Sequence, residues 1–245
     1  MTNDEQQIEL EAVRWIRRTA NKRLIIEKFA SLEVYAPSEH PLIIFAAGSP
    51  GAGKTEFIKE FRQSIEQIQR VRPVVIDPDA IRELLPGYTG SNSYLFQRVV
   101  SIAVDDLFRH VIKNSQSAFV DGTLSDYNRA YLNINTVIEK YGVAMICFVF
   151  QHPTTAWHFT QLREAVEGRN IRQADFIERF LGAKVTVDKL KARFGDKVIL
   201  NVILKDYKDT KENKAVAKVF NNVASVEQCL EFDYTKASIE RILAQ

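Results

Sequence analysis

The sequence has few cysteines, no long apolar run and almost no excess of either charge. Its two cysteines, Cys147 and Cys229, are too few for a disulfide scaffold and lack the spacing of metal ligands. There are 33 lysines and arginines against 31 aspartates and glutamates, so the net charge is only +2. Proteins that bind nucleic acid usually carry a strong basic field, and a nucleic-acid partner is therefore not expected.

Membrane insertion and secretion are not expected either. The longest apolar stretch, residues 143–150, is far shorter than the roughly 20 residues that a membrane-spanning helix requires. Residues 1–11 are polar and acidic and contain no apolar core of a signal peptide. We therefore expect a cytoplasmic protein. Hydrophobic residues at 46% and charged residues at 26% are ordinary for a folded globular chain.

Short apolar runs alternate with helical patterns along most of the chain. The runs predict about five buried strands, and the segments between them carry apolar residues at helical spacing. This alternation requires crossover connections and indicates an α/β fold with a mainly parallel sheet. The predicted strands are residues 42–47, 73–76, 118–120, 143–150 and 198–204, and a helical stretch over 154–193 is expected to break near Gly168 and Gly182.

The N-terminal part of the chain precedes the first predicted strand. Residues 2–32 have a helical pattern that starts with capping-box spacing between Thr2 and Glu5. One interpretation is a partner-binding or self-inhibiting arm. The other is a peripheral helix whose basic face is simply solvated. We expect an N-terminal helical extension over residues 1–36 and one α/β domain over residues 37–245.

The first predicted strand leads directly into a phosphate-binding motif. Residues 48–55 fit the pattern G-x-x-x-x-G-K-[ST], and an amphipathic helix follows them. In such a loop the glycines let main-chain N–H groups face the phosphates, and the helix directs its positive end at them. Lys54 would reach the terminal phosphates and the Thr55 hydroxyl would bind Mg²⁺. The predicted nucleotide-binding residues are Gly48, Ser49, Pro50, Gly51, Ala52, Gly53, Lys54 and Thr55.

Two classes of nucleotide-binding protein lack support in this sequence. A GTPase needs an N-K-x-D motif, but Asn213-Lys214-Ala215-Val216 has no aspartate. A mechanical ATPase usually has an apolar strand that ends in Asp-Glu, and the fourth predicted strand instead ends in Phe150-Gln151. These differences favour a phosphotransferase that acts on a small molecule.

Two aspartates follow the second predicted strand. Asp77 and Asp79 flank Pro78, and Arg82 lies one helical turn further on. Asp77 and Asp79 would face the same side if the strand geometry continued. A phosphotransferase needs a carboxylate near the acceptor hydroxyl, so one of the two aspartates could accept its proton while the other orients Mg²⁺ or its waters. Alternatively, Asp79 caps a helix that begins at Ala80.

Further candidate residues follow the third and fourth strands. Asp121-Gly122-Thr123 could bind an acceptor hydroxyl or act near Mg²⁺, although Asp121 could instead close a turn. Arg163, Arg169 and Arg172 could close over the phosphates as a lid, with Gly168 as a hinge. For any one of these arginines, a solvated helix face paired with Glu164, Glu167 or Glu178 is the alternative.

Taken in order, these segments resemble the zeta toxin family of P-loop kinases over roughly residues 42–180. The resemblance rests on the loop, the Asp-x-Asp-x-x-Arg segment from Asp77 to Arg82, the acidic-Gly-Thr segment at Asp121, and the later arginines. It implies a three-layer P-loop kinase fold that uses ATP (or GTP) with Mg²⁺. It also implies that the acceptor is the 3′-hydroxyl of UDP-N-acetylglucosamine.

The resemblance assigns a role to each matching residue. Lys54 would hold the β- and γ-phosphates and Thr55 the metal. Asp79 resembles the general base of the family, and Arg163 and Arg169 resemble its two phosphate-clamping arginines. The remaining predicted residues, for substrate binding, are Asp77, Arg82, Asp121 and Thr123.

Two differences from the family pattern concern the acceptor. The family often has Glu-Gly-Thr where this chain has Asp121, and often a proline after the second arginine where this chain has Ile171-Arg172. Another hydroxyl acceptor, such as a polynucleotide end or an antibiotic, therefore stays open. So does a nucleotide-dependent interaction module. The resemblance further implies an antitoxin, supplied as a separate chain or as an N-terminal segment such as residues 1–36.

Overall fold

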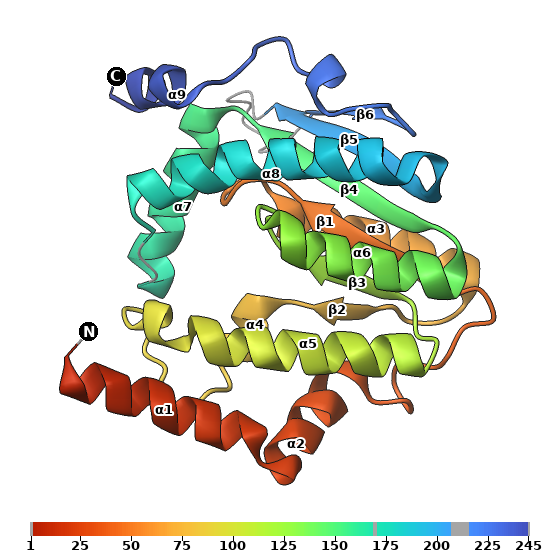
Figure 1. Ribbon diagram of the computed structural model, residues 1–245, viewed down its shortest axis with the longest axis vertical. Helices are drawn as coiled ribbons and strands as arrows, with labels where there is room; N and C mark the ends of the chain where they lie inside the picture. The colour runs from red at the N-terminus through yellow and green to blue at the C-terminus, as the bar shows by residue number, and fades with distance from the viewer. Residues whose placement is uncertain (1, 169–170, 207–215, 245) are drawn as a thin grey trace. The chain divides into compact units, whose positions relative to one another are not determined.

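The computed structural model describes residues 2–168, 171–206 and 216–244 (Figure 1). These residues separate into two compact units. Unit 1 comprises residues 1–42, 61–120 and 163–170, and unit 2 comprises residues 43–60, 121–162 and 171–245. None of the helices described in this structure is long and apolar enough to cross a membrane.

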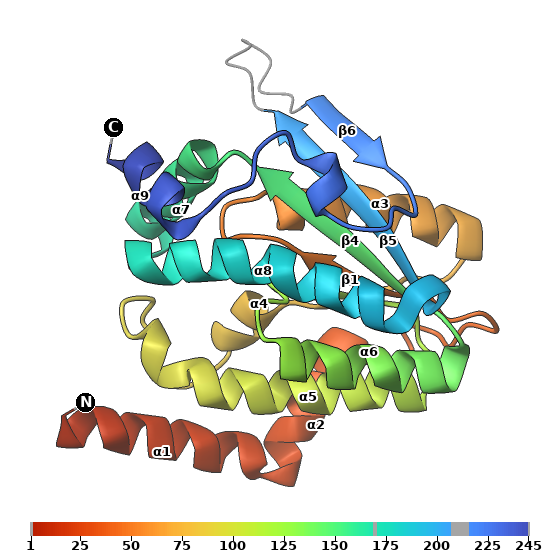
Figure 2. The ribbon, with the colours of Figure 1, turned by 45° about the horizontal axis from the view of Figure 1, so that its top comes forward.

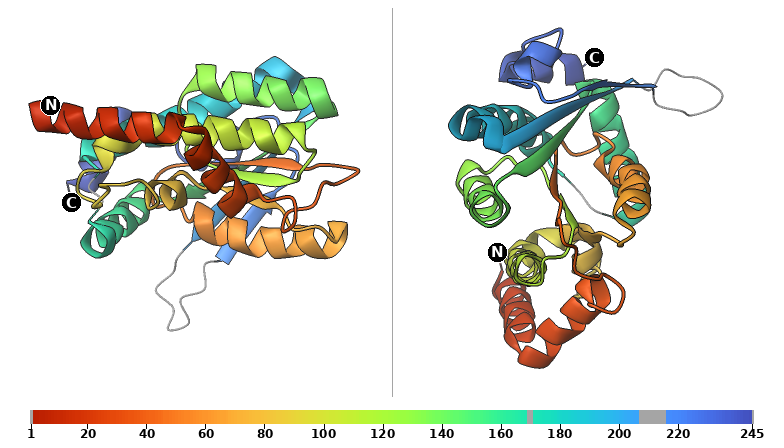
Figure 3. Two further views of the ribbon diagram at one scale, coloured as in Figure 1. Left: turned by 90° about the horizontal axis from the view of Figure 1, so that it is seen from below. Right: turned by 90° about the vertical axis from the view of Figure 1, so that its right-hand side faces the viewer.

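Unit 1 is built on two parallel strands. Strand β2 (Val74–Ile76) pairs in parallel with β3 (Ala118–Asp121), whose last residue belongs to unit 2. Helix α5 (Gln97–Lys113) contacts β2, and the two N-terminal helices contact α5, as Figure 3 shows. The amphipathic face of α5 is therefore covered by the N-terminal part of the chain.

The N-terminal part forms two helices where the sequence predicts one. Helix α1 (Asn3–Arg17) begins with the predicted capping box of Thr2, and α2 (Thr19–Ala30) follows after one extended residue, Arg18. The side-chain amide of Asn21 donates to the carbonyl of Trp15 at 2.8 Å, so it satisfies an acceptor at the end of α1. This turn lets both helices bury apolar residues in unit 1.

Unit 2 holds four strands in the order β1-β4-β5-β6. The strands β1 (Ile43–Ala47), β4 (Ala144–Gln151) and β5 (Val198–Asp206) are parallel, and β6 (Val216–Phe220) is antiparallel to β5. Figures 1 and 3 show α6 and α8 on one face of these strands and the first part of α3, residues 54–60, on the other, which gives unit 2 three layers. The predicted α/β class with mainly parallel strands is confirmed.

The sequence accounts for five of the six strands in the described part of the chain. The sixth, β6, is missing from the prediction because five residues at the edge of a sheet give little periodicity. Figure 2 shows it beside β5. The other elements are α3 (Lys54–Gln69), α4 (Pro78–Arg82), η1 (Ser93–Phe96), α6 (Tyr127–Tyr141), α7 (Pro153–Glu167), α8 (Gln173–Phe194), η2 (Gly195–Lys197), η3 (Glu227–Cys229) and α9 (Lys236–Leu243).

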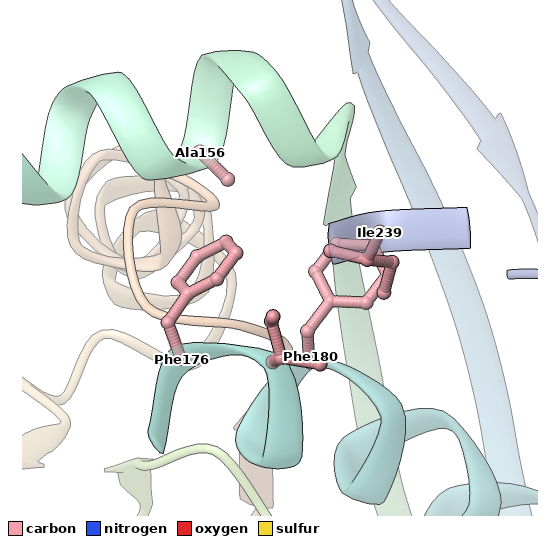
Figure 4. Packing of buried hydrophobic residues seen from close by; sticks show 5 residues of the cluster. Ala156, Phe176, Phe180 and Ile239 are labelled. Atoms are coloured by element: carbon pink, nitrogen blue, oxygen red, sulfur yellow. The ribbon is translucent and has the colours of Figure 1, made fainter. Parts of the chain in front are cut away.

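One of the two predicted helix breaks is confirmed and the other is wrong. Helix α7 ends before Gly168, but α8 continues through Gly182. A Cβ atom at Gly182 would lie 3.2 Å from the Cβ of Ser125, so this glycine allows a close approach instead of ending the helix. The buried cluster in Figure 4 packs α7, α8 and α9 together in unit 2. Its labelled members are Ala156, Phe176, Phe180 and Ile239.

Candidate functional site

The predicted phosphate-binding loop connects β1 to α3 in unit 2. Its glycines at 48 and 51 have positive φ angles of 136° and 71°. A Cβ atom would lie 2.2 Å from the carbonyl oxygen of Val149 at Gly48, and 2.0 Å from that of Ala156 at Gly51. No side chain fits at either position, because main-chain atoms cannot move aside. The loop therefore lies directly against the backbone of β4 and α7.

The lysine of the motif bends back over the loop. The ammonium of Lys54 donates to the carbonyl oxygen of Ser49 at 2.8 Å and to that of Gly48 at 3.3 Å. The N–H of Gly48 donates to the carbonyl oxygen of Thr123 at 3.4 Å, which ties the loop to the segment after β3. A cation beside the N-terminus of a 16-residue helix is a suitable environment for phosphate oxygens.

The residues of the loop also fit a nucleotide-bound magnesium ion. Thr55 lies in the first turn of α3 and is exposed. Within residues 2–168, 171–206 and 216–244, no three His, Cys, Asp or Glu side chains gather as metal ligands. Mg²⁺ in kinases is usually held by few protein groups together with substrate phosphates, so a single hydroxyl ligand fits that arrangement. The positive φ angles at Gly48 and Gly51 fit a loop whose main-chain N–H groups face bound phosphates.

The two aspartates in unit 1 have different roles. Helix α4 begins at Pro78, so its N-cap is Asp77, whose carboxylate accepts the N–H of Asp79 at 2.8 Å. The alternative that Asp79 caps this helix is therefore wrong. Since β2 ends at Ile76, the strand alternation also does not extend to Asp79. Burial raises the pKa of Asp77 above its usual value, and the N–H of Asp79 opposes that shift.

Asp79 forms ion pairs with two arginines in unit 1. Nη1 of Arg82 lies 2.5 Å from Oδ1 of Asp79, and Nη2 of Arg163 lies 3.3 Å from Oδ2. The Arg82 side chain is 3% exposed and that of Arg163 is 45% exposed. Arg82, predicted to bind substrate, is thus buried against Asp79. Arg163 is accessible from solvent.

The remaining predicted residues differ in their surroundings. Asp121 is the last residue of β3, and the hydroxyl of Thr123 lies 2.8 Å from that of Ser125. Arg169 lies outside the described residues. Arg172 precedes α8 and binds Asp175 through two hydrogen bonds of 2.8 and 2.9 Å, in place of the glutamates considered from sequence.

One residue that contacts the loop is not among the site residues predicted from the sequence. Lys205 lies near the end of β5, is buried, and donates to the carbonyl oxygen of Gly53 at 2.9 Å. The signal in the sequence is a lysine within an otherwise apolar strand end. It could not be interpreted from sequence alone, because nothing there indicates that the end of β5 reaches Gly53.

Comparison with known proteins identifies the family. The family model of the zeta toxins matches residues 27–222, which is most of the chain. A solved chain of the PezAT chromosomal toxin–antitoxin system of Streptococcus pneumoniae is 16% identical, with a TM-score of 0.61, over 100% of this chain and 93% of that chain. A chain of the AvrRxo1-ORF1:-ORF2 complex with ATP is 14% identical, with a TM-score of 0.58, over 88% of this chain and 67% of that chain.

At these identities the solved structures establish the fold alone. No curated protein sequence matches the chain. The family model is the finding that goes beyond the fold, because it spans the loop, both aspartates of the second strand end and Arg163. The chain belongs to the zeta toxin family.

Proposed function

We propose that this P-loop phosphotransferase transfers the γ-phosphoryl group of ATP (or GTP) to a hydroxyl group of a small acceptor, with UDP-N-acetylglucosamine as the first candidate. The phosphate-binding loop carries Lys54 and Thr55. The carboxylate is that of Asp79, which has two arginine partners. Phosphoryl transfer needs groups of both kinds.

The proposal is supported above all by the surroundings of the Asp79 carboxylate. Asp77 performs the capping of α4, so the carboxylate of Asp79 is not required for it. Asp79 is also a quarter exposed, and one of its partners, Arg163, is solvent-accessible. The ion pair with Arg82 neutralises a buried cation in any case, so the ion pair with the solvent-accessible Arg163 is the one that bears on function. This favours a kinase over a nucleotide-dependent interaction module.

The proposed reaction assigns one task to each group. The acceptor oxygen forms a bond to the γ-phosphorus while the bond from that phosphorus to the bridging oxygen of the nucleotide breaks. The acceptor proton moves to the carboxylate of Asp79, and the nucleoside diphosphate leaves. Lys54, Arg163 and Arg169 stabilise the charge on the phosphoryl oxygens. Mg²⁺ at Thr55 would neutralise part of the phosphate charge when bound.

A second set of residues is proposed to bind the acceptor. It consists of Asp77, Arg82, Asp121 and Thr123. Asp121 has a shorter side chain than the glutamate common in the family, which favours a second candidate. In that case the hydroxyl belongs to another molecule, such as a polynucleotide end or an antibiotic.

Incubation with labelled ATP, Mg²⁺ and a panel of acceptors tests the reaction. The panel contains UDP-N-acetylglucosamine, nucleosides, aminoglycosides and short oligonucleotides. We expect label on the sugar nucleotide. Label on another member would replace the acceptor but keep the reaction class, and no label on any acceptor, despite nucleotide binding, would favour the interaction module.

Two variants test the assignment of Asp79. Asp79→Asn should lower turnover by roughly 10²- to 10⁴-fold while nucleotide binding is kept, because a general base contributes about that much. Asp175→Asn is the matched control, since Asp175 is similarly exposed and also binds an arginine, Arg172, whose side chain is 79% exposed. Near-normal turnover of Asp79→Asn, or an equal loss in the control, would eliminate the assignment.

The proposed partner is an antitoxin protein. The PezAT structure is that of a toxin–antitoxin system. In this chain residues 1–26 precede the part matched by the family model. Residues 1–36 are therefore proposed as a helical extension to a kinase domain over 37–245. They either inhibit the kinase themselves or form part of the surface that an antitoxin covers.

A further inference from the structure

Two buried lysines in unit 2 donate to main-chain carbonyl groups. Lys191, on α8, is 9% exposed and donates to the carbonyl oxygens of Gly195 at 3.2 Å and Val198 at 2.7 Å. Lys205, on β5, is 8% exposed and donates to that of Gly53 at 2.9 Å. The two side chains have similar burial and the same kind of acceptor. Only Lys205 contacts the phosphate-binding loop.

Gly53 and Lys205 fit each other closely. A Cβ atom at Gly53 would lie 2.9 Å from Nζ of Lys205 and 3.1 Å from its Cδ. The second glycine of the motif thus leaves room for a side chain from β5, besides adopting a φ of 82°. The carboxylates of Glu56 and Glu60 on α3 favour the charged form of Lys205, although burial lowers its pKa overall.

The hydrogen bond is not needed to satisfy the Gly53 carbonyl group. That oxygen already accepts the N–H of Phe57 at 3.2 Å, in the first turn of α3. Burying an ammonium group is costly, so a methionine of similar shape in place of Lys205 would not be expected to reduce the stability of the fold. A role in the geometry of the loop accounts for the lysine better than a role in stability.

The geometry of the peptide group connects Lys205 to the site. The carbonyl of Gly53 and the N–H of Lys54 belong to one planar trans peptide, so they point in opposite directions. A donor that fixes the carbonyl therefore also fixes the direction of the Lys54 N–H. This N–H is one of the main-chain donors that face the phosphates in a loop of this kind.

We propose that Lys205 is a positioning residue of the phosphate-binding loop: by holding the Gly53 carbonyl it orients the Lys54 peptide for the phosphates of the nucleotide. The inference rests on the proposed function only in requiring that the loop binds a nucleoside triphosphate. Lys205 acts on nucleotide affinity through the loop and not on the acceptor.

The test compares full-length variants by titration calorimetry with ATP and Mg²⁺. Lys205→Met should weaken ATP binding by about 10-fold or more, the range expected when a charged hydrogen bond is lost. It should leave the KM of the acceptor and the free energy of unfolding in urea nearly unchanged. Lys191→Met is the matched control and should bind ATP as the wild type does. Lys205→Arg, which keeps a cationic donor, should restore most of the affinity.

Each outcome decides one question. ATP affinity of Lys205→Met within twofold of wild type, or an equal loss in Lys191→Met, would overturn the role of Lys205. If Lys205→Met does not fold, Lys205→Leu decides on the same scale, because leucine has no hydrogen-bond donor for the Gly53 carbonyl. A wild-type protein that binds neither ATP nor GTP would overturn the proposed function, and this result is distinct from the others.

Discussion

Two neighbouring aspartates with the same chemistry have different tasks because of one proline. Pro78 opens α4, so the residue before it becomes the N-cap and the residue after it enters the first turn. Asp77 therefore directs its carboxylate to the main chain, and Asp79 directs its carboxylate to the arginines. The functional assignment of Asp79 depends on this local geometry.

The pKa of Asp77 leads to a prediction about stability and pH. Because burial raises its pKa in the folded state, the folded protein binds more protons than the unfolded chain between the unfolded value, near 3.8, and the raised value. This carboxyl therefore makes the protein less stable as pH rises through that range. Asp77→Asn keeps a capping oxygen and removes the titration.

The difference in free energy of unfolding between Asp77→Asn and wild type should thus be more in favour of the variant at pH 6.5 than at pH 3.5. Urea unfolding of both proteins at the two pH values measures this difference. A difference that does not change with pH, or that changes in the opposite direction, would contradict the interpretation of Asp77 as a cap with a desolvated carboxyl.

The cysteines permit a second prediction at the residue scale. Cys147 lies in β4, and burial raises its pKa to about 12, while burial also raises the pKa of Cys229. The thiolate is the reactive form, so both should resist alkylation by iodoacetamide at pH 8 in the folded protein. Mass spectrometry with and without denaturant checks this. Rapid labelling of folded protein at Cys147 would contradict it.

Among the helices, α8 depends on a glycine in its interior. A glycine there normally weakens a helix. Gly182, however, lies against Ser125, and a Cβ atom at Gly182 would be 3.4 Å from the Ser125 carbonyl oxygen. Gly182→Val should lower the free energy of unfolding by about 1–3 kcal/mol, because the added methyl groups overpack this contact.

An exposed position on the same helix provides the control. Glu178→Val introduces the same side chain where it meets solvent, and should change the free energy of unfolding by no more than about 0.5 kcal/mol. Denaturant titration of the two variants measures both values. Equal effects at the two positions would show that helix propensity alone, and not the contact with Ser125, determines the outcome.

For the whole molecule, the sequence predicts what depends on local pattern. Strand runs, the loop motif and the first capping box follow from residues close together in the chain, and the structure contains all of them. The capping of α4 is also local, but the alternative in which Asp79 is the cap placed the start of this helix at Ala80, two residues after its actual start at Pro78. The proline was the available signal for the correct boundary.

Contacts between distant segments were not predictable in the same way. Lys205 and Gly53 are 152 residues apart, and only the order of the strands in unit 2 brings β5 to the loop. The pairing of Arg163 with Asp79 likewise depends on the course of α7. The break at Arg18 follows from packing on α5 and from the Asn21 side chain, neither of which is evident in the pattern of residues 2–32.

The N-terminal helices contribute directly to the core of unit 1. Val13, Ile16 and Ile25 are buried, and the side chain of Gln116 donates to the carbonyl oxygens of Ala30 and Tyr35 at 3.0 and 2.7 Å. Removing residues 1–36 should therefore lower the free energy of unfolding by roughly 5 kcal/mol, since each fully buried aliphatic side chain contributes about 1.5–3 kcal/mol. Denaturant titration of the truncated chain checks this, and unchanged stability would contradict it.

A truncated enzyme that is inactive would consequently say nothing about self-inhibition. Reversing charge on the exposed face of α1 separates inhibition from folding, because Arg14 and Arg17 are both exposed. The double variant with Arg14→Glu and Arg17→Glu removes favourable charges from the end of a helix, at a cost of about 1 kcal/mol each, and leaves the buried face intact. If the basic face inhibits the kinase, turnover should rise in this variant. Turnover equal to that of wild type in a folded protein would exclude self-inhibition through this face and leave two interpretations of it, antitoxin docking and a solvated surface.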